Sequence, residues 1–375
     1  MIKIFLLIAS IKLGGSENVA LSIAEHCKLA RQDDFEFVIV ELFPTRDAYA
    51  LNKKQKLVSQ NIRTITLAKT PKRMSLLPGP LRLVYFLLKE KPQIVHSHTD
   101  LPDLVLSTTL RILSFFGIKK PKIIRTIHST QLWPTHFNLG KYTEKAFSDE
   151  RICGVSEPTL KAYNELRRKY HFPVSVHQQI INNGCIIPDR KPHPFNIDTA
   201  KINIAFCGRF EDYKGMDVLI PCIQMIYALY PGDFLFHIIG SGTFQHEIDK
   251  LANDYDTVLV YEAVPDIAAK LYDFDYLFMP SHFEGLALMS IEASFAKIPV
   301  IATFASGLKE TLPPDWPLMF HKENREELMA IFEKIKNKSY DYEMLKNQAF
   351  RFVNEHFSMN KMIDTYAELY RRINE

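Results

Sequence analysis

The chain has 375 residues, of which 47% are hydrophobic and 24% are charged, a composition that is ordinary for a globular protein with two α/β domains. No apolar run approaches the roughly 20 residues of a transmembrane helix, and five scattered cysteines without a C-x-x-C pair argue against a disulfide framework or a zinc site. The net charge of +3 hides a split, because residues 1–190 carry 28 basic and 16 acidic residues. We therefore expect a cytosolic protein with a basic N-terminal half.

Apolar, strand-like runs alternate with amphipathic helical stretches along this half, which is typical of a parallel sheet with crossover helices. The first ten residues mimic a short signal peptide, but a glycine-rich turn and a helix follow at once, so we expect a buried first strand. The expected strands are 2–9, 35–42, 62–66, 93–97, 121–128, 151–155 and 177–181, and the expected helices are 16–30, 76–90, 101–116 and 156–170.

A proline-rich polar segment at residues 188–195 is typical of a linker, and a second α/β series begins after it. Its expected strands are 201–207, 234–239, 257–261, 276–279 and 298–303, and three helices close the chain. We therefore predict an N-terminal domain of residues 1–187 and a second domain of residues 188–358. Such domains bind ligands near the C-terminal ends of their strands.

Two glutamates, Glu284 and Glu292, stand eight positions apart where a strand is expected to turn into a helix. If a helix begins directly after Glu284, its rise separates the two residues by roughly 12 Å along the axis. Carboxylates that far apart cannot share one metal ion, but they can hold the two ends of an elongated, hydroxyl-rich ligand whose phosphates rest on the helix N-terminus. The alternative is that Glu284 caps the helix and Glu292 lies on its solvated face.

A pair of cations, Arg209 and Lys214, stands between Gly208 and Gly215 after the first strand of the second domain. Two cations beside a helix N-terminus form a diphosphate site, since arginine donates through a planar fork and lysine acts as a mobile point charge. The alternative is an ordinary pair of surface charges.

These motifs, in this order along nearly the whole chain, resemble those of retaining glycosyltransferases of the GT-B fold, specifically glycosyltransferase family 4. The matching patterns are E-x7-E at residues 284–292 and G-R-x-x-x-x-K-G at residues 208–215. The resemblance implies two Rossmann-like domains that face each other across a cleft, with a last helix at about 359–375 that packs back on the first domain. It also implies transfer of a sugar from a nucleotide-diphosphate sugar, without a metal and with retention of configuration.

The resemblance implies a set of donor-binding residues in both domains. Arg209 and Lys214 stabilise the leaving diphosphate, Glu284 meets the sugar, and Glu292 binds the ribose. The remaining donor-side residues are the strand-end glycines Gly240 and Gly242, the N-terminal loop glycines Gly14 and Gly15, and the backbone of Gly285, Leu286, Ala287 and Leu288. A lone G-x-G is a weak signal, because tight strand-to-helix turns need glycine anyway.

Histidines at strand ends complete the predicted site. By resemblance, His128 lies close to the transferred sugar as a catalytic residue, and His98 and Ser16 are acceptor-side candidates. His96 and His98 fall on one face of a strand by alternation, but no third ligand is apparent in the sequence, so we predict no metal site there. The D-x-D pair Asp273 and Asp275 precedes an apolar strand, and we interpret it as structural.

The sequence departs from the family pattern at three positions where glycine is usual: Ala287, Lys297 and Glu262. Ala287 matters most, because the loop must present its amides to a phosphate without the conformational freedom of glycine. These departures leave the pose of the donor open.

The predicted partners are a UDP- or GDP-linked sugar as donor substrate, no other cofactor, and a glycan or lipid-linked acceptor of the bacterial surface polysaccharide or lipopolysaccharide type. Three basic clusters in the N-terminal half favour docking on an anionic membrane, although a solvated helix explains any one of them. They are Lys69, Lys72, Arg73, Arg82, Lys89 and Lys91; Lys119, Lys120, Lys122 and Arg125; and Lys161, Arg167, Arg168 and Lys169. No nucleic-acid motif accompanies them.

Two other functions fit the same residues. One is a hydrolase or epimerase of the same fold that acts on a nucleotide sugar. The other is a non-catalytic subunit that only binds a partner or a membrane.

Overall fold

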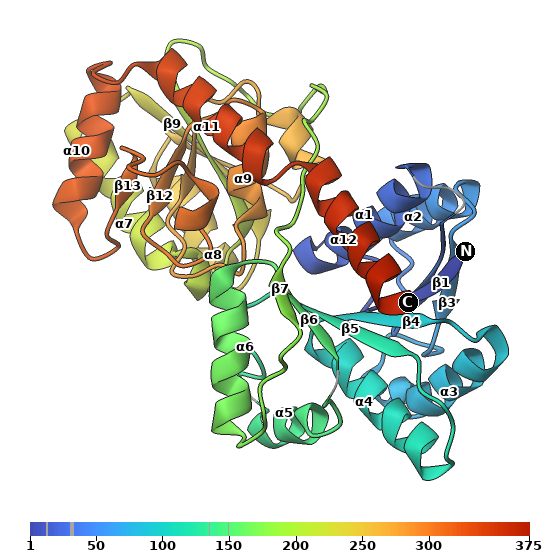
Figure 1. Ribbon diagram of the computed structural model, residues 1–375. Helices are drawn as coiled ribbons and strands as arrows, with labels where there is room; N and C mark the ends of the chain where they lie inside the picture. Colours follow the sequence, from blue (N-terminus) through green and yellow to red (C-terminus); the bar gives the residue numbers. More distant parts are fainter. Residues whose placement is uncertain (13, 31–33, 135, 149) are drawn as a thin grey trace. The chain divides into compact units, whose positions relative to one another are not determined.

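The computed structural model describes residues 1–12, 14–30, 34–134, 136–148 and 150–375 (Figure 1). The chain divides into two compact units, one of Met1–Gly184 with Met359–Glu375 and one of Cys185–Ser358. The predicted boundary between residues 187 and 188 lies three residues beyond this division. Within the described ranges, no helix combines the length and the apolar character that a membrane span requires.

Seven parallel strands form the sheet of the first unit, in the order β3-β2-β1-β4-β5-β6-β7. They are Ile2–Ile8 (β1), Phe35–Glu41 (β2), Arg63–Thr66 (β3), Ile94–His98 (β4), Lys122–Ile127 (β5), Arg151–Gly154 (β6) and Gln178–Ile180 (β7). The central strand β1 is buried from Ile4 to Ile8, as expected where both faces of a parallel sheet are covered. All seven strands lie within a few residues of their predicted positions.

The helices of the first unit are Gly15–Ala30 (α1), Ala48–Ser59 (α2), Gly79–Glu90 (α3), Asp100–Phe115 (α4), Phe137–Glu144 (α5), Glu157–Lys169 (α6) and Met359–Asn374 (α12). The expected helix 76–90 is shorter than predicted: a separate 3₁₀ turn, Arg73–Leu76 (η1), precedes it, since Pro78 and Pro80 disfavour a continuous helix there. The sequence analysis missed α2 and α5. The start of α2 has a cap signal, since the Asp47 side chain accepts from the amide of Ala50 at 2.8 Å.

The last helix, α12, belongs to the first unit, where it packs against α1 and β1. Its buried residues recur at helical spacing, and Tyr366 and Tyr370 are the largest of them. The Tyr370 ring stands edge-on to Phe35 at 5.7 Å between centroids. This apolar face explains why the end of the chain returns to the first unit.

Six parallel strands form the sheet of the second unit, in the order β10-β9-β8-β11-β12-β13. They are Ile202–Arg209 (β8), Phe234–Ser241 (β9), Val258–Tyr261 (β10), Tyr276–Met279 (β11), Val300–Thr303 (β12) and the unpredicted, two-residue Met319–Phe320 (β13). Because β8 lies between β9 and β11, the loops that follow these three strands meet at one edge of the sheet. That edge is the topological switch point, where open α/β sheets bind ligands.

The helices of the second unit are Met216–Leu229 (α7), Gln245–Asp254 (α8), Leu288–Phe295 (α9), Arg325–Lys336 (α10) and Tyr342–His356 (α11). Three 3₁₀ turns join them to the strands: Asp212–Lys214 (η2), Ile267–Lys270 (η3) and Lys309–Thr311 (η4). One continuous apolar core, with the buried side chains of β8, β9 and β11 at its centre, holds these elements together.

Candidate active site

The cation loop, residues 208–215, follows β8 and packs directly against the loop that follows β11. Gly215 has φ +78°, and a Cβ added there would lie 1.9 Å from the carbonyl oxygen of Pro280. The amide of His282 also donates to the carbonyl of Tyr213 at 2.8 Å. Only glycine at position 215 permits this approach, so the two predicted motifs are held together by backbone contact.

The packing brings Lys214 and Glu284 into an ion pair. The Lys214 Nζ lies 2.6 Å from Glu284 Oε1, and Ser281 Oγ donates to the same oxygen at 2.9 Å. Both side chains are largely buried, with 19% of Lys214 and 12% of Glu284 exposed, so the pair is partly shielded from water. The structure thus joins two residues that the sequence separates by 70 positions.

Arg209 stands at the exposed rim of this loop. Its guanidinium donates to the hydroxyl of Tyr213 and lies 5.5 Å from the centroid of the Tyr213 ring. The Tyr213 ring in turn stacks on Phe283 at 5.3 Å. An exposed guanidinium held by an aromatic support is available to an anionic ligand.

The glycines at the ends of β8 and β9 have a structural reason of their own. A Cβ added to Gly240, whose φ is +147°, would lie 1.8 Å from the carbonyl oxygen of Gly208, and one added to Gly242 would lie 2.5 Å from that of Phe210. Close packing between two neighbouring strand ends therefore requires both glycines. Their predicted contact with a donor remains a prediction.

The loop from Glu284 to Leu288 is tied to the segment after β12. The amide of Glu284 donates to Ser306, and that of Ala287 donates to Gly307, both at 2.8 Å. The amide of Leu288 donates to Leu286 at 2.9 Å. The resemblance implies that the amides of Ala287 and Leu288 bind a phosphate. They can do so only if their hydrogen bonds to the carbonyls of Gly307 and Leu286 are broken.

The three positions where glycine is usual in the family differ in backbone conformation. Ala287 has φ −77° and is buried in the core, so its backbone needs no glycine. Glu262 is exposed after β10 and has no left-handed backbone. Lys297 has φ +60° at the end of α9, and the amides of Lys297 and Ile298 return to Ser294 and Ala293 as in a Schellman motif. Lys297 is thus the departure that carries strain.

Helix α9 begins at Leu288 rather than directly after Glu284, so the 12 Å spacing that assumed a continuous helix does not apply. Glu292 lies in the second turn of α9, partly buried beside Cys207 and Cys185. Burial, and then the charge of Asp266, raise the pKa of Glu292 to about 7. Among the described residues no hydrogen bond to this carboxylate is found, so it can accept the hydroxyls of a ligand.

A possible cation site, which the sequence analysis did not predict, lies beside the cation loop. Ligand atoms of Asp212, Asp217 and His282 lie within 4.8 Å of one another, and His282 Nε2 is 2.8 Å from Asp217 Oδ1. Both aspartates are exposed. The D-x-D pair has structural partners, since Asp273 binds Arg190 and Asp275 accepts from the amide of Asn203.

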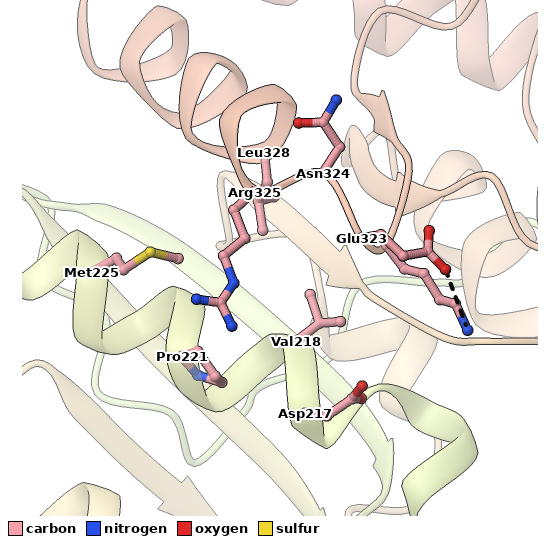
Figure 2. A pocket seen from close by; sticks show the side chains of 9 residues that line it. Asp217, Val218, Pro221, Met225, Glu323, Asn324, Arg325 and Leu328 are labelled. Carbon is pink, nitrogen blue, oxygen red and sulfur yellow. Dashed lines mark ion pairs between the residues drawn. The ribbon is translucent and has the colours of Figure 1, made fainter.

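A cavity of about 330 Å³ lies between α7 and the start of α10. It is lined by Asp217, Val218, Pro221, Met225, Lys322, Glu323, Asn324, Arg325 and Leu328. Figure 2 shows the Arg325 side chain directed from α10 toward α7, and the ion pair of Lys322 with Glu323 is 3.7 Å long. None of the predicted donor residues lines this cavity, so it is not the predicted donor site.

In the first unit, the predicted histidines form a buried cluster at the ends of β4 and β5. His98 Nδ1 lies 2.9 Å from His128 Nε2, and the rings of His96 and His98 stand 4.2 Å apart on one face of β4. Burial lowers the pKa of His128 to about 3 and that of His98 well below its usual range. The imidazoles are therefore neutral at pH 7, and the two partners of His96, Tyr370 and Thr126, leave it no nitrogen for a metal.

A cavity of about 210 Å³ opens beside His128, lined by Thr99, Asp100, Leu101, Asp103, Thr126, Ile127, His128, Ser129 and Leu132. The sequence analysis missed Asp100, although it lies two residues after β4, at the start of α4, where a side chain reaches a binding edge. Burial raises the pKa of Asp100 to about 6, and its carboxylate accepts from the amide of Trp133 at 3.1 Å. The cavity thus combines a neutral imidazole with a carboxyl that titrates near neutral pH.

The N-terminal glycine loop carries a carboxylate that the sequence analysis overlooked. Helix α1 begins at Gly15, and a Cβ added to Gly14 would lie 2.8 Å from Oε2 of the buried Glu17. Ser16 Oγ donates to the same oxygen at 2.8 Å, and Lys12 Nζ lies 3.6 Å from Glu17 Oε1. The Glu17 carboxylate, paired with Lys12, therefore lies directly beside this loop, and the predicted contact of Gly14 and Gly15 with a donor phosphate stays a prediction.

The two Rossmann-like halves have the fold of GT-B glycosyltransferases. HepE from Anabaena, solved with UDP-glucose, superimposes with a TM-score of 0.77 at 17% identity over 99% of this chain and 100% of its own. The lipopolysaccharide outer core galactosyltransferase WaaB does so with a TM-score of 0.68 at 14% identity, over 99% of this chain and 100% of its own.

Sequence comparison agrees with this fold. Residues 201–336 match the family model described as glycosyl transferases group 1. The whole chain is also similar to an uncharacterized glycosyltransferase of Haemophilus influenzae, at 24% identity over 94% of this chain and 95% of that protein. The matched segment contains the cation loop, both glutamates and the strand-end glycines.

Proposed function

We propose that this protein is a glycosyltransferase that uses a nucleotide-diphosphate sugar as donor, bound by the second unit. The observation that carries the proposal is the partly shielded Lys214–Glu284 ion pair, which lies beside the exposed guanidinium of Arg209 at the switch point of the sheet. A pure binding scaffold has no need for this arrangement together with the unpaired carboxylate of Glu292.

In the reaction, the bond between the sugar C1 and the diphosphate oxygen breaks, and a bond from C1 to an acceptor hydroxyl oxygen forms. Negative charge develops on the leaving diphosphate, where Arg209 and Lys214 stabilise it with charges that are already in place. We propose that the hydroxyl proton is taken up by the leaving phosphate, with retention of configuration and without a metal. The resemblance to retaining family 4 enzymes supports this stereochemistry.

Each glutamate has a separate role in donor binding. Glu284 orients Lys214 and accepts hydrogen bonds from hydroxyls of the sugar, while Glu292 accepts those of the ribose. A carboxylate without a partner binds two neighbouring hydroxyls well, because ligand binding supplies the hydrogen bonds that burial has removed. For the first unit, we propose that the cavity beside His128 binds a hydroxyl-bearing group through the neutral imidazole.

The donor and acceptor classes come from the relatives. UDP-glucose is bound in the structure of HepE, which favours a UDP-linked hexose over a GDP-linked one. WaaB, whose name assigns it to the lipopolysaccharide outer core, favours a glycan or glycolipid acceptor of a bacterial surface polysaccharide. Both assignments are proposals, because these proteins share less than a fifth of their residues with this chain.

The first test is thermal stabilisation against UDP-, GDP-, ADP- and CMP-sugars, with and without EDTA. A ligand that binds only the folded protein raises the midpoint by mass action, so one donor class gives a clear shift that chelation leaves unchanged. The test variant is Arg209→Ala, and its matched control is Arg351→Ala, which changes an exposed arginine of α11. Only Arg209→Ala should lose the thermal shift. No shift across the panel contradicts the proposal, and a shift lost with EDTA contradicts the metal-independent reaction and assigns a role to the cluster of Asp212, Asp217 and His282.

Product analysis separates the remaining functions. With donor and a lipopolysaccharide-type acceptor, a transferase releases the nucleoside diphosphate together with a glycosylated product whose anomeric configuration matches the donor. Release of free sugar without acceptor identifies a hydrolase instead. Donor binding without turnover under any acceptor identifies a non-catalytic subunit.

A further inference from the structure

Helix α3 presents an apolar stripe to solvent. Leu81, Tyr85 and Leu88 are 62%, 56% and 46% exposed, and at 100° per residue they fall within about 60° of one another. The core-facing residues Gly79, Leu83 and Leu87 lie on the opposite side of the helix. The fourth exposed residue of α3 is Lys89, the only charged one among them.

The stripe continues beyond the helix at both neighbouring segments. Met74 and Leu77, just before α3, are 79% and 76% exposed. Helix α4 packs along α3, where Thr109 Oγ1 donates to the carbonyl of Pro80 at 3.3 Å, and α4 ends in the exposed pair Phe115 and Phe116. Large apolar side chains that gather on neighbouring surface elements mark an interaction surface rather than isolated exposure.

The charge around these apolar residues is strongly one-sided. Residues 67–122 carry ten basic residues and three acidic ones. The acidic three are engaged elsewhere: Glu90 binds Arg63, Asp103 is buried with Arg125, and Asp100 lies in the cavity beside His128. The exposed lysines are Lys69, Lys72, Lys89, Lys91, Lys119, Lys120 and Lys122.

The structure also corrects the basic clusters of the sequence analysis. Arg125 is buried against Asp103 and Glu144, and Arg167 is buried against Glu144, so neither can meet an external anion. The second cluster therefore keeps Lys119, Lys120 and Lys122 at the surface, and the third keeps Lys161, Arg168 and Lys169 on α6.

We propose that this α3–α4 surface, defined as residues 67–91 and 114–122, docks on an anionic lipid bilayer. Apolar side chains at the centre enter the headgroup region, and the surrounding lysines bind lipid phosphates. The charge argues against a second copy as the occupant, because a symmetric dimer would bring the same lysines against one another. The apolar centre argues against nucleic acid, because it offers no hydrogen-bonding groups to base edges or phosphates.

The proposal extends the proposed function, in that it names a partner for an enzyme with a lipid-linked acceptor, but it does not depend on the donor site. The test is co-sedimentation of the full chain with vesicles of phosphatidylcholine alone or with 30% phosphatidylglycerol. We expect at least tenfold tighter binding to the anionic vesicles, with an affinity that falls as salt rises.

Two sets of variants test the apolar and the charged parts separately. Leu77→Asp with Leu81→Asp should lower vesicle binding at least tenfold, whereas Leu229→Asp with Met344→Asp, two equally exposed apolar residues of the second unit, should change it less than twofold. Lys89→Glu with Lys119→Glu should also lower it at least tenfold, and the exposed Lys250→Glu of α8 serves as its control. The far-UV circular dichroism spectrum and the unfolding midpoint without ligand, measured on the same preparations, show that the variants are folded.

Three results would overturn the proposal. Equal binding to neutral and anionic vesicles removes the role of the lysines. An equal loss in the control variants removes the role of this surface. A concentration-dependent dimer that Leu77→Asp with Leu81→Asp dissociates, without vesicle binding by the wild type, shows that a second copy is the occupant. If the protein binds anionic vesicles but shows no thermal shift with any donor sugar, the proposed function fails and the docking proposal stands. The two failures are therefore distinguishable.

Discussion

The cation loop of the second unit and the cavity beside His128 in the first unit both hold polar side chains. The two sites differ in how far these side chains are exposed to water and in the charge that they carry. Lys214 and Glu284 are partly exposed and form an ion pair. His98 is buried and His128 lines a cavity, and loss of hydration lowers the pKa of both imidazoles, so they are neutral at pH 7. Partial exposure is thus compatible with charged side chains, while burial favours the neutral form of an imidazole.

The largest expected effect tests the charged side of this comparison. Arg209→Ala should lower turnover roughly 100- to 1,000-fold, because it removes one preorganised donor to the leaving diphosphate. The free energy of unfolding should stay unchanged, since Arg209 is exposed. The measurement is the initial rate of nucleoside diphosphate release, with Arg351→Ala as control, and a rate within a few-fold of wild type would refute the leaving-group role.

The next largest expected effect concerns the contact between the cation loop and the loop that follows β11. Gly215→Ala should lower the free energy of unfolding by about 3 kcal/mol, because the new Cβ adds left-handed strain and a clash with Pro280. Gly232, with φ +85° and nothing within 4 Å of an added Cβ, is the matched control, and Gly232→Ala should cost about 1 kcal/mol. Urea unfolding measures both, and equal losses would mean that close packing against Pro280 contributes nothing.

The neutral histidines of the first unit predict that the protein loses stability as the pH falls. His128 has a pKa of about 3 in the folded protein against an ordinary value of 6.5, so the unfolded chain binds the proton first as pH falls. The free energy of unfolding should therefore fall from pH 6.5 toward pH 3, by about 1.4 kcal/mol per pH unit for this one group. Urea unfolding at pH 7, 6 and 5 should show a flatter dependence in His128→Gln, and an unchanged one in the exposed His246→Gln. A slope that His128→Gln leaves intact would show that His128 is not the group responsible.

Glu292 lies between these two cases, since it is partly buried and is proposed to bind the ribose as a carboxylate. With a pKa of about 7, its carboxylate is mainly protonated at pH 6 and ionised at pH 8. The ionised form accepts hydroxyls better, so the affinity for a nucleotide sugar should rise roughly tenfold between these values. The intact nucleotide sugar is the right ligand, because a terminal phosphate would itself titrate near pH 6.

The control for Glu292 is a carboxylate with ordinary exposure. Glu292→Gln should bind the donor with an affinity that no longer depends on pH, while the exposed Glu262→Gln should keep the wild-type dependence. A pH dependence that survives in Glu292→Gln would assign it to another titrating group.

The smallest effect concerns the end of the helix that carries Glu292. Lys297→Gly should raise the free energy of unfolding by about 1 kcal/mol and leave donor binding unchanged, because glycine adopts φ +60° without strain. Lys338 closes α10 in the same way at φ +53°, so Lys338→Gly should give a similar gain. A loss of stability at both positions would show that the lysine side chains contribute more than the strain costs.

Much of the fold could be predicted because the strands are continuous apolar runs separated by turn residues. The helices were harder where the pattern is weak: α2 buries two residues, Ala50 and Leu57, and α5 is eight residues long. The donor-site candidates came from motif spacing together with the resemblance to a family, and their contacts with a donor stay predictions. The structure adds that close strand packing requires Gly240 and Gly242, and that the carboxylate of Glu17 lies beside Gly14.

By itself, the sequence determined the order of parallel strands and helices, the positions of Arg209, Lys214, Glu284 and Glu292 near strand ends, and the excess of positive charge in the first half. Period and composition carry this information because burial selects apolar residues locally along each element. Only the tertiary structure decided that Lys214 pairs with Glu284, that His128 is neutral, and that Leu81, Tyr85 and Leu88 face solvent. Each of these depends on what a distant segment places beside the residue, since the distance between charges and the loss of water set their energies.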